Sequence, residues 1–101
     1  MKKWMPYKGG VSIGEKGSES GIVLYDEEFD GGCRITMEKC TRYYAITCGV
    51  YGAMVHTVFC GSSNAKELYE AMKLELGKFM NSSTTETEEI EFYDYFCNKY
   101  N

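Results

Sequence analysis

The most reactive side chains in this chain are five cysteines and one histidine. A thiolate nucleophile needs a base within reach, and histidine commonly fills that role. His56 is the only histidine, so a cysteine-dependent enzyme would have to combine it with Cys48 or Cys60. These three residues are the catalytic candidates. In the strand pairing expected below, His56 and Cys48 lie on opposite sheet faces, which favours a protein without catalytic function.

The same residues are poorly spaced for a metal site. Local zinc-binding pairs place their cysteines within about four residues of each other, a spacing that no two cysteines have here. His56 and Cys60 are separated by roughly 13 Å if they lie on one strand. We therefore expect no metal and no cofactor. The cysteines should be core thiols, with Cys33 facing Cys48 across two strands, and the sequence leaves open whether those two are bonded.

The net charge of −4 is concentrated in the last part of the chain, where five acidic residues after position 84 are opposed by Lys99 alone. The remainder is balanced and has no basic stripe, which argues against nucleic-acid binding. No apolar run is long enough to span a membrane, and the N-terminus does not resemble a secretory signal. We therefore expect no membrane association and a cytoplasmic location in which the thiols are reduced.

The length and pattern predict a single α+β domain over residues 1–101, with an irregular Gly/Ser-rich segment at 1–21. Residues 22–60 should form an antiparallel four-stranded β-meander rich in Tyr, Ile, Thr and Val. Two-residue turns are expected at Asp30-Gly31, Cys40-Thr41 and Tyr51-Gly52. They predict one apolar face made of Ile22, Leu24, Cys33, Ile35, Met37, Tyr44, Ile46, Cys48, Val55 and Phe59, and one polar face made of Tyr25, Glu27, Arg34, Thr36, Glu38, Tyr43, Thr47 and His56.

Helical periodicity is clearest over residues 64–80, where Asn64 and Glu67 have the spacing of a capping box. The apolar stripe of this amphipathic helix consists of Ala65, Leu68, Tyr69, Met72, Leu76, Phe79 and Met80. A second helix is predicted over 85–100, with Thr85 and Glu88 as its capping box. Its apolar stripe would be Ile90, Tyr93, Phe96, Cys97 and Tyr100. The alternation at residues 90–92 leaves a strand as the alternative.

Aromatic side chains outside the predicted core suggest a contact surface, because interfaces are enriched in such rings. The candidates are Tyr25, Tyr43, Leu74, Phe92 and Tyr95. The interpretation that follows is a non-catalytic protein-interaction or regulatory domain that self-associates as a dimer. The acidic tail adds a basic protein as a second kind of partner. The alternatives are a small Cys/His-dependent enzyme and a domain that binds a small ligand between the sheet and the tail.

Overall fold

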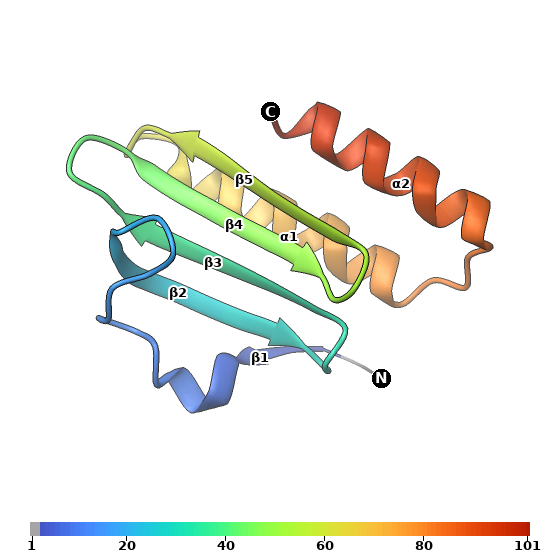
Figure 1. Ribbon diagram of the computed structural model, residues 1–101, viewed down its shortest axis with the longest axis horizontal. Helices are drawn as coiled ribbons and strands as arrows, with labels where there is room; N and C mark the ends of the chain where they lie inside the picture. The colour runs from blue at the N-terminus through green and yellow to red at the C-terminus, as the bar shows by residue number, and fades with distance from the viewer. Residues whose placement is uncertain (1–2) are drawn as a thin grey trace.

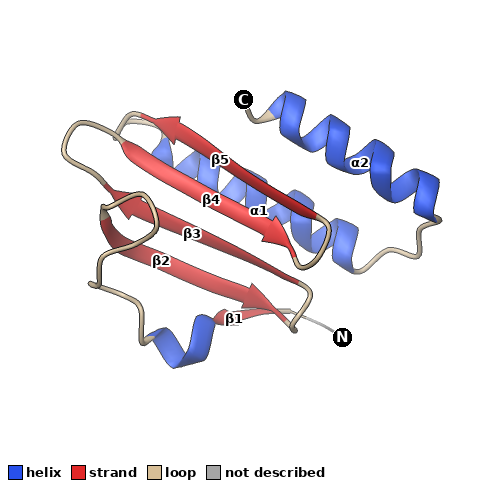
Figure 2. Ribbon diagram, viewed as in Figure 1, coloured by secondary structure: helices blue, strands red, loops and turns tan. Residues whose placement is uncertain are grey.

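A computed structural model describes residues 3–101 of the chain as one antiparallel sheet and two helices (Figure 1). In chain order the elements are β1 (Trp4–Pro6), a 3-10 turn (Tyr7–Gly10), β2 (Ile22–Phe29), β3 (Cys33–Lys39), β4 (Tyr44–Val50), β5 (Met54–Cys60), α1 (Ala65–Met80) and α2 (Glu86–Lys99). The strand order is β1-β2-β3-β4-β5, and α1 lies behind the sheet (Figure 2). The predicted α+β class is confirmed, although the sheet has five strands instead of four. Neither described helix is long and apolar enough to cross a membrane.

The additional strand lies within the N-terminal segment that was predicted to be irregular. In β1, Trp4 is paired with Phe29 and Pro6 with Glu27 of β2. The Trp4 ring also packs edge-on against the Phe29 ring, at 5.3 Å between centroids. Pro6 argued against a strand because it cannot donate a backbone hydrogen bond. It is tolerated here because β1 is short and forms the edge of the sheet.

All three hairpin turns are longer than the two residues expected from the sequence. A turn that is one residue longer shifts the register by one and exchanges the two faces of the following strand, whereas two extra residues leave the faces unchanged. The β2–β3 and β4–β5 turns have three residues each and the β3–β4 turn has four. The pairs that close them are Phe29 with Cys33, Val50 with Met54, and Lys39 with Tyr44.

The predicted faces of β5 are therefore wrong. Val55 and Phe59, expected in the core, are 80% and 57% exposed on the sheet face that carries no helix, whereas Val58 is buried. His56 is paired with Cys48 and shares the helix-covered face with it, instead of lying on the opposite face.

The faces of β2 also differ from the prediction between Tyr25 and Phe29, because the longer turn shifts their register by one, and a β-bulge between Val23 and Tyr25 returns Ile22 and Val23 to the predicted register. Tyr25 and Glu27 were expected on the polar face but point toward α1. The Tyr25 and Tyr69 rings are 5.3 Å apart, and the Tyr69 hydroxyl donates to Glu27 at 2.7 Å. Ile22, expected in the core, remains 49% exposed.

The core forms where α1 packs against the middle of the sheet. Tyr69, Met72 and Leu76 are fully buried, as their helical spacing predicts. Each buried side chain of this size contributes roughly 1.5–3 kcal/mol relative to an exposed one. The predicted capping box of α1 is absent, since the Asn64 side chain makes no capping hydrogen bond.

The second helix is confirmed, and the strand alternative is dropped. Its capping box forms between Thr85 and Glu88. Figure 1 shows α2 outside the outline of the sheet, beyond the edge formed by β5. The helix is held there by Phe92, which stacks on Phe79 of α1 at 4.1 Å, and by Phe96, which is fully buried.

Candidate functional site

The structure brings Cys48 and His56 together, as direct partners of β4 and β5. The His56 ring is, however, engaged elsewhere. Its Nε2 atom is hydrogen-bonded to the backbone carbonyl oxygen of Tyr100, and its ring lies 6.4 Å from that of Phe96. Because a carbonyl oxygen can only accept, Nε2 carries the proton in this contact, and Nδ1 is the ring nitrogen left to accept one.

The thiols themselves lack the environment of a nucleophile. Burial raises the pKa of Cys48 and of Cys33 to about 12 and also raises the pKa of Cys60. A reactive cysteine needs the opposite shift, because the thiolate is the nucleophile. Cys33 is paired with Val50, so the expected juxtaposition with Cys48 is wrong, and all five cysteines are free. Within residues 3–101, no three metal-binding side chains converge.

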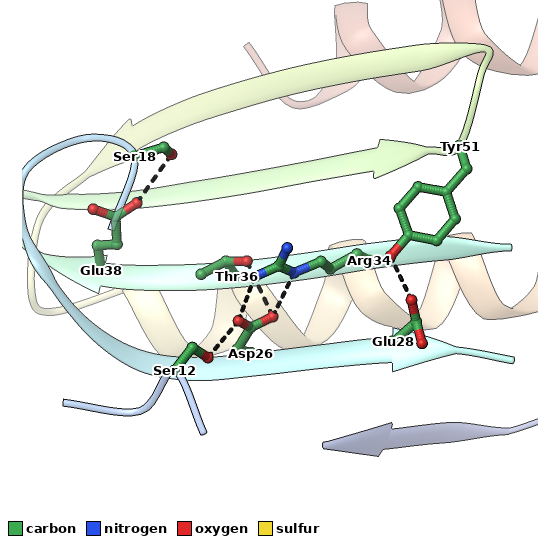
Figure 3. Close-up of polar contacts among 8 residues, drawn as sticks. All are labelled: Ser12, Ser18, Asp26, Glu28, Arg34, Thr36, Glu38 and Tyr51. Atoms are coloured by element: carbon green, nitrogen blue, oxygen red, sulfur yellow. Dashed lines mark hydrogen bonds and ion pairs between the residues drawn. The ribbon is translucent and has the colours of Figure 1, made fainter. Parts of the chain in front are cut away.

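A groove with a volume of about 390 Å³ lies on the sheet face opposite α1, beside the N-terminal segment. Asp26 and Arg34 form an ion pair on its floor, with the Asp26 side chain fully buried and Nη2 of Arg34 at 2.6 Å from its carboxylate (Figure 3). Burial raises the pKa of Asp26, but hydrogen bonds from Arg34, Ser12 and Thr36 bring it below its ordinary value. The Tyr7 ring stacks on the guanidinium group at 3.6 Å.

The far end of this groove is closed by Glu38, whose side chain points into the loop before β2 (Figure 3). Its carboxylate accepts the backbone N–H of Gly21 at 3.0 Å and that of Glu19 at 3.1 Å. Gly17 packs so closely on this carboxylate that an added Cβ would come within 2.3 Å of it. Glu38 therefore clamps the loop onto β3.

These polar contacts fasten the N-terminal segment to the sheet. Every buried side-chain nitrogen and oxygen in the described residues has a hydrogen-bond partner within the protein. In the groove, no buried polar group is therefore left without a partner for a ligand to bind. The polar network instead holds the N-terminal segment on the sheet. The segment covers the β2 and β3 half of this sheet face and leaves the β5 side open.

The open side ends in β5, which has no neighbouring strand on its outer edge in the described part of the chain. The strand has seven residues, without a charged residue, a proline or a bulge. Natural proteins commonly protect an exposed edge with such features, because unpaired backbone groups recruit other strands. The opposite edge, β1, is protected in this way, since it has three residues and contains Pro6.

The aromatic candidates from the sequence do not form one surface. Tyr43 lies beside Phe59 on the open sheet face, 5.4 Å between ring centroids, while Tyr25 is on the helix side. Leu74 is 58% exposed on α1, and Tyr95 is 48% exposed with its hydroxyl bonded to Glu75. Phe92 is packed against α1 and is thus unavailable for contact.

One feature of α2 was missed because its periodicity predicted a buried stripe. Phe96 and Tyr100 are indeed buried, but Ile90 from the same stripe is 55% exposed. Tyr93 and Cys97 are half-buried. Because Phe92 faces α1, the side of the helix that carries Ile90 is left uncovered. The sequence indicated these residues as apolar, but it gave no indication that part of the stripe would remain uncovered.

The chain matches no protein-family model, no curated protein and no solved structure.

Proposed function

We propose that this protein is a non-catalytic protein-interaction domain that binds an extended segment of a partner along β5. The observation that carries the proposal is the contrast between the two edges of the sheet. The β5 edge is long, uncharged and free of proline, whereas the β1 edge is short and contains Pro6. An extended segment added to β5 would satisfy the backbone groups of that edge, as in other proteins that bind by strand addition.

The exposed side chains of β5 favour the same interpretation. Val55 and Phe59 are large, apolar and 80% and 57% exposed on the sheet face that carries no helix. An added strand would place its own side chains directly beside them, at the spacing of cross-strand pairs. Contact with a neighbouring strand would therefore remove apolar surface from water on this face as well as pair the backbone.

A second copy of the chain is a less suitable occupant of this edge. Symmetric pairing of two β5 strands would bring the two α2 helices together, since α2 lies beyond β5 in Figure 1. Each α2 carries Glu86, Glu88, Glu89, Glu91 and Asp94. Like charges repel, and the two helices would also compete for the same space. Self-association, expected from the sequence, remains a prediction that light scattering over a concentration series can test.

The test uses a displayed library of random peptides of about twelve residues, selected on the full chain. Strand addition predicts that a selected peptide slows amide hydrogen exchange in β5 and leaves exchange in β1 unchanged. Binding elsewhere on the molecule, or a selection that yields no peptide, would contradict the proposal. A mass that doubles with concentration, with β5 protected, would assign the edge to a second copy.

A further inference from the structure

A second groove, with a volume of about 510 Å³, lies between β1 and α1, at the edge of the sheet opposite β5 (Figure 1). This volume is within the range of small-molecule sites in proteins. The lining combines apolar residues with charged and polar ones. Its apolar members are Trp4, Phe29, Leu74 and Gly77, and the others are Lys3, Glu70, Lys73, Lys78 and Asn81. We call this hollow the β1–α1 groove.

Gly77 helps to keep the groove open. It lies inside α1, where a glycine is less stable than an alanine. A Cβ atom at this position would come within 3.0 Å of Nε1 of Trp4. The glycine therefore lets the indole ring lie close to the helix backbone and adds no side chain of its own to the groove. The half-buried Trp4 ring also packs edge-on against Phe29, so one part of the lining is a packed aromatic surface.

The charged side chains of the groove are mainly lysines. Lys73 is paired with Glu27 at 2.8 Å, whereas no ion pair between described residues involves Lys3 or Lys78. Glu70 is the only acidic residue in the described lining. Together with Glu27, the groove has three cations and two acids, an excess of one positive charge in a chain whose net charge is −4. This local charge favours an anion with a single charge over a cation.

The groove on the other sheet face differs in this respect, because its charged residues Asp26 and Arg34 already pair with each other. In the β1–α1 groove, the two lysines without an acidic partner can turn toward a ligand, since lysine has a long and flexible side chain. Their aliphatic stems can at the same time cover an apolar ligand body. The apolar surface of Trp4 and Leu74 thus lies beside cations that are free to bind an anion.

We propose that the β1–α1 groove binds a small amphipathic carboxylate, such as a fatty acid of medium chain length. The hydrocarbon body would lie on Trp4 and Leu74, and the carboxylate would be held by Lys3 and Lys78. A carboxylate carries one negative charge and therefore matches the excess charge of the groove better than a phosphate does. This inference goes beyond the proposed function and is independent of it, because the groove and β5 lie at opposite edges of the sheet.

Trp4 is the only tryptophan of the chain, so its intrinsic fluorescence reports on this groove alone. The full chain is titrated with decanoate below its micelle concentration and with decyltrimethylammonium, which has the same chain length and the opposite charge. Decanoate should change the fluorescence in a saturable manner, and the cation should bind at least tenfold more weakly because the lysines repel it. No saturable change with decanoate, or equal affinity for the two probes, would overturn the proposal. A change with vesicles that contain phosphatidylglycerol, but none with decanoate, would overturn it in favour of a lipid surface.

Two matched pairs of variants locate the bound decanoate. Leu74→Ser removes an apolar side chain from the groove, and Ile90→Ser removes one from α2. The exposed fractions are 58% and 55%, so both variants should fold. Leu74→Ser should weaken decanoate binding about fivefold, whereas Ile90→Ser should leave it unchanged. Lys78→Gln should weaken binding about threefold at low salt and less at high salt, whereas Lys66→Gln, which removes an exposed lysine elsewhere on α1, should have no effect. Equal effects within either pair would overturn the proposal.

Discussion

Replacing Glu38 with alanine tests whether the N-terminal segment is fastened to the sheet by the carboxylate clamp. Residue Glu38 is 1% exposed, and its carboxylate holds two backbone N–H groups of the preceding loop. The Gly21 bond is buried, and the Glu19 bond is partly buried. In Glu38→Ala, the backbone N–H groups of Glu19 and Gly21 lose their acceptor. The alanine side chain is also too small to fill the space that the glutamate occupied.

The size of the effect follows from these two bonds. An unsatisfied buried donor costs about 1–3 kcal/mol, so the free energy of unfolding should fall by about 2–4 kcal/mol. Glu38→Gln is the matched variant, because both N–H groups converge on the same carboxylate oxygen, Oε1. An amide oxygen placed there keeps both bonds and loses only their charge, and the expected loss is about 1 kcal/mol.

Urea unfolding followed by circular dichroism measures the free energy, and amide hydrogen exchange at Gly21 measures the loop directly. Glu70→Gln, an exposed acid on α1, serves as the control for loss of a negative charge. The reasoning is refuted if Glu38→Ala costs less than about 0.5 kcal/mol and Gly21 exchanges no faster than in the unchanged chain. Equal losses for the alanine and glutamine variants would also refute it, because the charge would then matter more than the acceptor.

The remaining predictions concern the helix α2, acid stability, the thiols and β5. Phe96→Ala should lower the free energy of unfolding by about 3–5 kcal/mol in a urea titration, because the ring is fully buried. Burial raises the pKa of Glu75, but hydrogen bonds from Tyr100, Tyr95 and Lys99 bring it below the ordinary 4.5. Its stabilisation is therefore present above pH 4.5 and lost as the pH falls through the folded-state pKa, so Glu75→Gln should flatten an acid titration of stability between these values. Cys48 should resist a thiol reagent at neutral pH until the chain unfolds, since burial raises its pKa to about 12. Val55→Lys should change stability by less than about 0.5 kcal/mol in the same urea assay.

The sequence was sufficient for the elements that depend on local pattern. The β-meander and both helices follow from alternation, turn residues and a period of 3.6, which are properties of neighbouring residues. The first strand was missed because three residues, one of them Pro6, do not make a pattern. Pairing with β2 stabilises that strand, and this depends on contacts more than twenty residues away in the chain.

The strand register was predicted least well, because a difference of one residue in the length of a turn changes it. Asp30 and Gly31 do adopt positive φ, as the hairpin signal requires, but Gly32 also belongs to the turn. That single extra residue moved Glu27 to the helix side, where it is paired with Ile35. The β4–β5 turn is likewise one residue longer than predicted. His56 therefore lies on the same face as Cys48, and the prediction of opposite faces is wrong although both strands are present.

The candidate site could not be predicted for a related reason. Periodicity identifies residues that would be buried by a partner, but it does not reveal whether the chain supplies one. Ile90 and Phe96 belong to the same predicted stripe, and their burial differs because α2 rotates Phe92 onto α1 and extends past β5. The exposure of Ile90 is therefore a property of how α2 is placed against α1 and the sheet, which only the three-dimensional arrangement contains.

β5 carries no charged residue or proline that would discourage strand pairing, although a charged residue there would cost little stability. Val55 is 80% exposed, so a lysine at this position would lose almost no burial and would discourage other strands from pairing. The fold therefore does not require an uncharged edge. The same chain places five acidic residues on α2, the helix that lies beyond β5 in Figure 1. The proposed strand addition at β5 would therefore favour a basic segment over an acidic one, because the acidic residues of α2 would repel the latter.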